Sequence, residues 1–233
     1  MKGLAEFVMR GRFQALLVTV AGSGSLMFCW ISAAVVALVI LRKGVAAGLW
    51  LVFWGLLPAG VLAYAVGDSG PLSLLLGTTA LAIVLRNTVN LPLAVLASVA
   101  VGGLTGLAMV VFAGASLEQI VTYFGEFLAS LEQQLSQGDQ QIVLARPDAT
   151  QIAGMMGVGA GMTAVLCLLL ARYWQALLYN PGGFGGEFKA LYYPPAVAAL
   201  LALLTVGLAS MGASYRTWAM ICVIPLMFAG LAL

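Results

Sequence analysis

The side chains that most often perform chemistry are few and scattered in this chain of 233 residues. Histidine, the commonest metal ligand and general base, is absent from the sequence. Cys29, Cys167 and Cys222 stand singly in apolar runs without CxxC spacing, which indicates small buried hydrophobic residues. No apolar run carries an acidic residue near its middle, where a carboxylate that couples protons or ions would lie. The sequence therefore predicts no metal site, no cofactor and no proton-driven pump.

Hydrolytic chemistry within a membrane would also lack its catalytic groups. An HExxH metalloprotease motif and a Ser-His pair both require histidine, and paired membrane aspartates are absent. P-loop and dinucleotide-binding signatures are absent as well. An enzyme acting on lipid would need a nucleophile or a metal cluster, so we expect a protein that is not an enzyme.

The most distinctive stretch is the glycine-rich segment 180–194, in which four glycines surround an aromatic residue. Glycine allows backbone angles that other residues avoid, so this segment can fold tightly against a membrane face. Two interpretations stay open, a cytoplasmic loop that gates a pathway or docks a partner, and an ordered turn. The residues that would gate or dock are Asn180, Gly182, Gly183, Phe184, Glu187, Phe188 and Lys189.

The composition indicates which environment must position these residues. Hydrophobic residues make up 63% of the chain and charged residues 8%, whereas a soluble domain carries roughly 25% charged residues. Continuous apolar runs approach or exceed the roughly 17 to 25 residues that a helix needs to cross a bilayer. Because the runs do not alternate with period two, helices are predicted and a β-barrel is not. The predicted fold is an all-α transmembrane bundle, a single domain over residues 1–233, with the lipid bilayer as its surroundings and no nucleic-acid partner.

About six or seven membrane segments are expected. The first is too long for a signal-peptide core and leads into further spans. The third is short and ends in a polar run, so it either lines a site or forms a tight hairpin between two spans. The candidate segments are Phe13 to Leu41, Gly44 to Val66, Pro71 to Leu85, Leu91 to Ala113, Ile152 to Leu170, Pro195 to Met211 and Trp218 to Leu233.

The charges predict how these segments are oriented. If Arg10, Arg12, Arg42 and Lys43 are cytoplasmic, eight of the ten Lys and Arg residues lie inside, as expected for short cytoplasmic loops. The first run must then cross an even number of times. Its first arm, about nine residues before Gly22, measures roughly 14 Å and cannot span about 30 Å of hydrocarbon. We expect a re-entrant or shallow arm and a cytoplasmic N-terminus in a bacterial inner membrane; the alternative is a single crossing.

One sizeable segment, residues 114–151, is expected outside the membrane. Ser116 and Gln119 have the spacing of a capping box, so a helix should begin there. Apolar residues then recur at helical spacing, while acidic residues occupy other faces, and a polar loop follows over residues 136–150. This helix lacks the Lys and Arg that draw helices to anionic lipid. It should dock on the outer end of the bundle or on a partner protein.

Small residues recur at four-residue spacing in Gly102 to Gly106 and in Gly157 to Gly161. Such spacing lets helix backbones approach closely. Helix packing is the principal interpretation, and a glycine-lined permeation path is the alternative.

Two patterns carry a resemblance to a known family. These are Asn-Pro-Gly-Gly-Phe-x-x-Glu-Phe-x-x-Leu over residues 180–191 and the opening from Ala5 to Arg12. Together with the hydropathy of the whole chain, they resemble the YybS-like family of bacterial polytopic membrane proteins, a domain of unknown function. That family is distantly similar to the substrate-binding subunits of energy-coupling-factor transporters, and its members have further membrane segments. The resemblance therefore implies that the chain is truncated at Leu233.

Two functional hypotheses follow. In the first, the chain is a substrate-binding subunit of a transporter that binds a small organic molecule and depends on separate coupling subunits for energy. Its pocket would be lined from the outer ends of the spans, with Trp50, Trp54, Tyr64 and Tyr123 as candidate binding residues. In the second, the chain is a non-catalytic accessory or structural subunit of a larger membrane protein complex.

Overall fold

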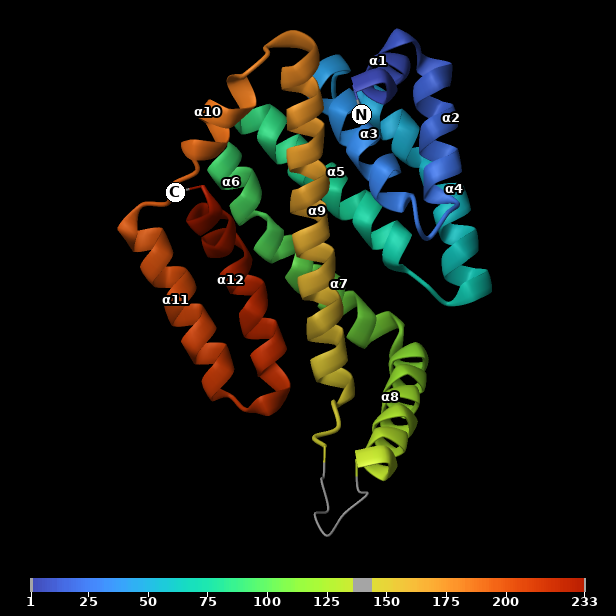
Figure 1. Cartoon of the computed structure of the whole chain (residues 1–233), viewed down its shortest axis with the longest axis vertical. Helices are drawn as coiled ribbons and strands as arrows, with labels where there is room; N and C mark the ends of the chain where they lie inside the picture. Colours follow the sequence, from blue (N-terminus) through green and yellow to red (C-terminus); the bar gives the residue numbers. More distant parts are fainter. Residues whose placement is uncertain (1, 136–143, 233) are drawn as a thin grey trace.

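The structure is a computed structural model that describes residues 2–135 and 144–232. Every regular element in these residues is a helix, so the predicted all-α fold class is confirmed (Figure 1). The elements are α1 (Lys2–Arg10), α2 (Arg12–Ser23), α3 (Cys29–Lys43), α4 (Val45–Val66), α5 (Gly70–Thr88), α6 (Leu91–Leu96), α7 (Ser98–Phe112), α8 (Gly114–Leu135), α9 (Ala149–Tyr179), α10 (Gly183–Lys189), α11 (Pro195–Ser210), η1 (Ala213–Tyr215) and α12 (Arg216–Leu231).

Five stretches of the described chain are long and apolar enough to cross a membrane. These are α4, α5, α6 continued by α7, α9, and η1 continued by α12, while α11 is apolar but shorter. Length and composition thus make the chain a multi-pass membrane protein.

The first apolar run is a helical hairpin. It breaks after Ser23, and α2 and α3 pack against each other on either side of the break. The ammonium of Lys43, at the end of α3, donates to the carbonyl oxygen of Met9 at 3.4 Å, so both ends of the hairpin lie at one end of the bundle. The thiol of Cys167 lies 3.5 Å from the carbonyl oxygen of Trp30, near the hairpin tip. Since Cys167 is twelve residues from the end of α9, about 18 Å of helix, the tip reaches only part of the way through the bundle.

The second arm of this hairpin forms the centre of the bundle. Residues 32–40 of α3 are all buried, on every side of the helix, as expected for a helix that is apolar all round. Helices α2, α4, α5 and α9 all pack against it. The central position of α3 explains why the hairpin is held within the bundle although neither arm is a full-length span.

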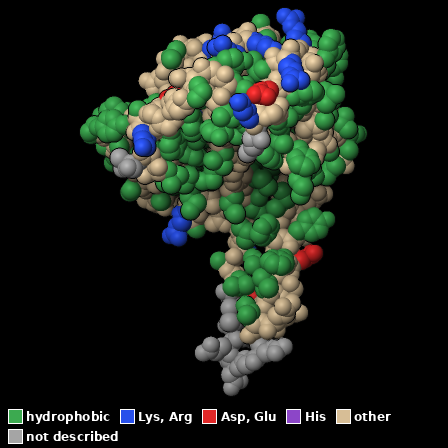
Figure 2. All heavy atoms as spheres, turned by 45° about the horizontal axis from the view of Figure 1, so that its top comes forward, with side chains coloured by type: hydrophobic (Ala, Val, Ile, Leu, Met, Phe, Trp, Pro, Cys, Tyr) green, Lys and Arg blue, Asp and Glu red, His purple; other side chains and the backbone are tan. Residues whose placement is uncertain are grey.

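Most of the Lys and Arg side chains visible in Figure 2 gather at one end of the bundle. We call the end where Arg12 and Lys43 lie the basic end. Arg86 joins them by donating to the carbonyl oxygens of Ile40 and Leu41, both at 2.8 Å, and the Arg42 guanidinium stacks on Tyr179. The opposite end, where Asp68 lies and α8 begins, is called the cavity end for the feature described below. The residues predicted to share one side of the membrane, Arg12, Arg42, Lys43 and Arg86, thus lie at the same end of the bundle.

Helices α7 and α9 cross at the predicted glycines. A Cβ atom on Gly102 would lie 2.8 Å from the carbonyl oxygen of Gly157, and a Cβ on Gly157 would lie 2.5 Å from that of Gly102. Gly161 lies against the Ser98 carbonyl and Gly106 against that of Ala153. The four-residue spacing therefore serves close helix packing.

Several boundaries differ from those predicted. Helix α5 continues into the polar run and ends at Thr88, where Val89 takes a left-handed angle, and the Arg86 guanidinium donates to carbonyl groups of α3. Helix α9 continues past Leu170 to Tyr179. The predicted capping box at Ser116 is wrong, because α8 begins at Gly114; the box lies instead at the start of α9, with Asp148 as the cap.

Candidate functional site

The largest cavity described lies at the cavity end and measures about 640 Å³. The tip of the α2–α3 hairpin, the α4–α5 connection, the start of α5 and helices α7, α8 and α9 line it. Its lining residues are Leu26, Cys29, Val66, Gly67, Asp68, Ser69, Gly70, Pro71, Ser73, Leu74, Thr105, Met109, Ser116, Ile120, Phe124, Ile152, Met155, Met156, Gly159, Ala160 and Thr163. A cavity of this size accommodates a small organic molecule.

The α4–α5 connection supplies the charged and most polar part of the wall. A carboxylate oxygen of Asp68 accepts a hydrogen bond from the Gly70 amide at 2.7 Å, which fixes the turn before α5. The hydroxyl of Ser73 donates to the Gly70 carbonyl, and that of Ser69 to the Met109 sulfur. Asp68 is the sole charged residue in the lining, so the wall favours a neutral or cationic ligand over an anion.

Helices α7 and α9 supply an apolar wall with two hydroxyl groups. The Thr105 hydroxyl donates to the Val101 carbonyl and the Thr163 hydroxyl to the Gly159 carbonyl, each at 2.8 Å, which leaves their acceptor lone pairs free for a ligand. Met109 of α7 and Met155 and Met156 of α9 also line the cavity. Methionine is flexible and polarisable, so this wall can adapt to ligands of irregular shape.

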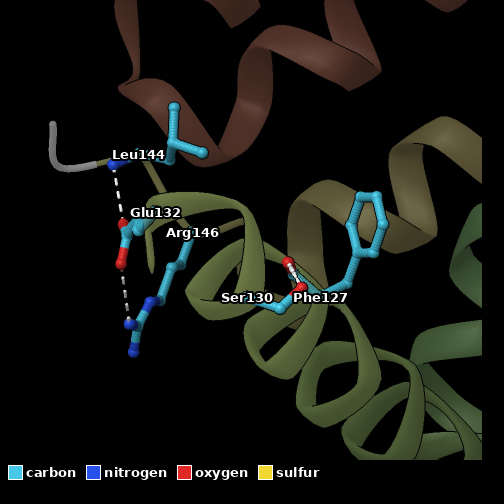
Figure 3. A network of polar contacts seen from close by, with 5 residues as sticks. All are labelled: Phe127, Ser130, Glu132, Leu144 and Arg146. Atoms are coloured by element: carbon cyan, nitrogen blue, oxygen red, sulfur yellow. Dashed lines mark hydrogen bonds and ion pairs between the residues drawn. The ribbon is translucent and has the colours of Figure 1, made fainter. Parts of the chain in front are cut away.

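Helix α8 forms the outer wall and is anchored at both of its ends. Near its start, Leu117 is buried in a small cluster with Ile152 and Ala153 of α9. Near its far end, the Glu132 carboxylate accepts from the Leu144 amide at 2.8 Å and lies 3.7 Å from the Arg146 guanidinium (Figure 3). These contacts hold α8 beside the segment that leads into α9, so that its Ile120 and Phe124 face the cavity.

The four aromatic residues predicted to bind substrate do not line this cavity. Trp50 and Trp54 contact each other on α4, with ring centroids 6.4 Å apart, but Trp50 lines a separate cavity near the basic end. Tyr64 and Tyr123 are exposed side chains on α4 and α8. The structure therefore brings together only the tryptophan pair, and neither tryptophan lines the cavity at the cavity end.

The glycine-rich segment is more ordered than the predicted loop. Gly182 has φ of 89°, a left-handed angle that favours glycine, and α10 begins at the next residue. The Phe184 ring packs edge-on against Tyr173 of α9 and stacks on Phe188. The Gly183 amide, at the start of α10, donates to the Asn180 carbonyl in the turn after α9, and Lys189 is exposed at the end of α10.

Two residues of the segment 180–194 contact helices of the bundle. Glu187, predicted to dock a partner, forms an ion pair with Arg172 of α9. In the following linker, the buried hydroxyl of Tyr193 donates to the Pro92 carbonyl at 2.9 Å, and burial raises the pKa of Tyr193 above its ordinary value. Gln175 also receives a hydrogen bond from Arg172. These contacts fix α10 on the basic end.

A double-mutant cycle tests the Arg172–Glu187 pair. Because each side chain is only about a quarter exposed, we expect Arg172→Gln and Glu187→Gln each to lower the free energy of unfolding by about 1 kcal/mol and to be non-additive. Unfolding in detergent micelles measures the coupling. The Lys2–Glu6 pair, which is far more exposed, is the control and should couple by only a few tenths of a kcal/mol. Strict additivity at Arg172 and Glu187 would contradict the assignment.

The cavity residues that sequence reasoning missed carry one recognisable signal. Asp68 is the sole acidic residue between Glu6 and Glu118, and it is followed by Ser69 and Gly70 between two apolar runs. An isolated carboxylate at the junction of two spans is a candidate site residue. The methionines and threonines of α7 and α9 carry no such signal, because they are typical of any membrane helix.

The described residues hold no group of three or more side chains suited to bind a metal ion. Comparison with family models, with curated proteins and with solved structures finds no match for the chain.

Proposed function

We propose that the chain is a substrate-binding subunit of a bacterial inner-membrane transporter, without energy-coupling machinery of its own. It would capture a small organic molecule in the cavity at the cavity end, which we call the outer cavity. The observation that carries this proposal is the cavity of about 640 Å³ at the cavity end. Helix ends, a re-entrant hairpin tip and an outer helix together enclose it, as in transporters whose sites form where membrane helices are discontinuous.

The lining limits the class of substrate. The cavity is lined by one carboxylate, five hydroxyl-bearing residues and three methionines. This lining suits a molecule with an apolar body and a hydrogen-bonding or cationic group. The basic end would face the cytoplasm, in keeping with the excess of Lys and Arg there. Separate coupling subunits would then dock at this cytoplasmic end.

Native mass spectrometry of the chain purified in mild detergent tests the proposal. We expect an organic molecule bound at a stoichiometry near one, together with co-isolated membrane or ATPase subunits at low detergent. Purification from several growth media separates a physiological ligand from a medium component. A chain that carries neither a small molecule nor a partner under these conditions would refute the proposal.

A second candidate function is favoured by one observation on α8. Tyr123 and Phe127 are exposed large side chains on a helix that projects from the bundle (Figure 1). Such a surface suits an accessory or structural subunit that contacts a larger membrane complex. Crosslinking from Glu126 and Lys189 tests this role, and crosslinks confined to the chain itself would exclude it.

A further inference from the structure

A second cavity, of about 400 Å³, lies at the basic end between α2, α3 and α4. Two cations, Arg12 and Lys43, line its mouth together with Trp50. Its remaining wall is apolar and includes Ala15, Val39 and Leu51. The cavity therefore combines positive charge with an apolar interior. It lies at the open end of the α2–α3 hairpin, whereas the outer cavity lies at the hairpin tip.

The charges at this cavity are not neutralised by the chain. Among the described residues, no carboxylate forms an ion pair with Arg12 or Lys43. Lys43 donates to the Met9 carbonyl at 3.4 Å, a neutral partner that leaves its charge in place. Glu6 and Glu187, two carboxylates at this end, are paired with Lys2 and Arg172. An anion would thus meet two uncompensated cations.

The apolar side chains beyond the mouth indicate what kind of anion fits. Trp50 lies five residues into α4, about 8 Å from its start, a depth typical of aromatic side chains at a membrane interface. Phe53 and Trp54 follow it on the exposed surface of α4, and Phe13 and Leu17 are exposed on α2. A ligand with an acidic headgroup and hydrocarbon chains would contact the cations with one end and these residues with the other.

We propose that the cavity between α2, α3 and α4 binds the phosphate headgroup of an anionic phospholipid, with Arg12 and Lys43 as its cationic partners and Trp50 at the headgroup–chain boundary. Basic pockets between membrane helices on the cytoplasmic side bind acidic headgroups in this way. Bound lipid would also fill the space beside the hairpin and fasten α2 to α4. The site is separate from the outer cavity, so either proposal can fail without the other.

Native mass spectrometry with two defined lipids tests the site. The purified chain is titrated with phosphatidylglycerol and with phosphatidylcholine of the same acyl chains. We expect retention of phosphatidylglycerol in preference to phosphatidylcholine. Two lost cations should lower phosphatidylglycerol retention by roughly 30-fold in the Arg12→Gln/Lys43→Gln variant. The Arg146→Gln/Arg216→Gln variant loses the same charge away from the basic end and should bind as the unmodified chain does.

Three further results decide the outcome. The Arg12→Lys/Lys43→Arg variant keeps both charges, so it should retain the lipid preference even if the glutamine variant folds poorly. Equal retention of the two lipids by the unmodified chain, or loss of the preference in the charge-preserving variant, would overturn the proposal. Displacement of phosphatidylglycerol by millimolar glycerol phosphate would also overturn it, because the occupant would then be a soluble phosphate ester.

Discussion

Gly157→Leu should prevent stable packing of α7 against α9 and lower the free energy of unfolding by roughly 3 kcal/mol or more, at or beyond the upper end of ordinary overpacking. The reason is that a Cβ on Gly157 would lie 2.5 Å from a backbone atom, the Gly102 carbonyl oxygen. Side chains can rotate away from such contacts, but a helix backbone can relieve them only by moving the whole helix. Because α9 also packs against α3, α5 and α12, the displacement would disturb the centre of the bundle.

Thermal unfolding in detergent, monitored by size-exclusion chromatography of the heated samples, gives the midpoint temperature that measures this loss. Gly159→Leu is the matched control, since a Cβ there meets nothing within 4 Å on the same helix. We expect the control to retain the midpoint and the yield of the unmodified chain. Equal midpoints for Gly157→Leu and the unmodified chain would show that the crossing is looser than the structure has it.

Gly159→Trp should abolish binding of the small molecule proposed to occupy the outer cavity. Gly159 lines that cavity, and open space surrounds the position of its Cβ, so an indole there would occupy the ligand's volume without disturbing the helix. We expect the amount of ligand recovered per mole of protein to fall at least tenfold, which corresponds to the loss of about 1.4 kcal/mol or more of binding free energy. Extraction of equal amounts of purified protein and mass spectrometry measure the recovery.

Gly103→Trp is the matched control for that experiment. It also replaces a glycine whose Cβ would meet nothing within 4 Å, but it lies on α7 and outside the cavity lining. We expect full ligand recovery from this control and the same thermal midpoint in both variants. Undiminished recovery from Gly159→Trp would place the ligand somewhere other than the outer cavity.

The sequence predicted the parts of the fold that depend on composition and charge. Apolar runs locate the helices because a bilayer requires every backbone group to be satisfied within a segment. The hairpin of α2 and α3 was predicted from arginines and lysines at both of its ends, and the structure confirms that these ends lie together. The glycine spacing likewise predicted the α7–α9 crossing.

The cavity could not be predicted, because it is formed by elements that are distant in the sequence. Leu26 at the hairpin tip, Asp68 after α4 and Phe124 on α8 meet only through tertiary packing. Aromatic residues such as Trp50 and Tyr64 were predicted to bind the substrate instead, yet both have exposed side chains on α4. A tertiary contact also satisfies the end of α3, since Arg86 of α5 donates to two of its last carbonyl groups.

The central claim is that the basic end is cytoplasmic and that the hairpin returns to it, which makes the large cavity face outward. The direct test is labelling of intact cells with a membrane-impermeant maleimide, after replacement of Cys29, Cys167 and Cys222 by alanine. Single cysteines are introduced as Lys2→Cys, Lys43→Cys and Ser210→Cys. Ser210 lies at the end of α11 and is exposed. We predict labelling of position 210 in intact cells, and of positions 2 and 43 only after permeabilisation. Labelling of positions 2 and 43 from opposite sides, or of both from outside, would contradict this account.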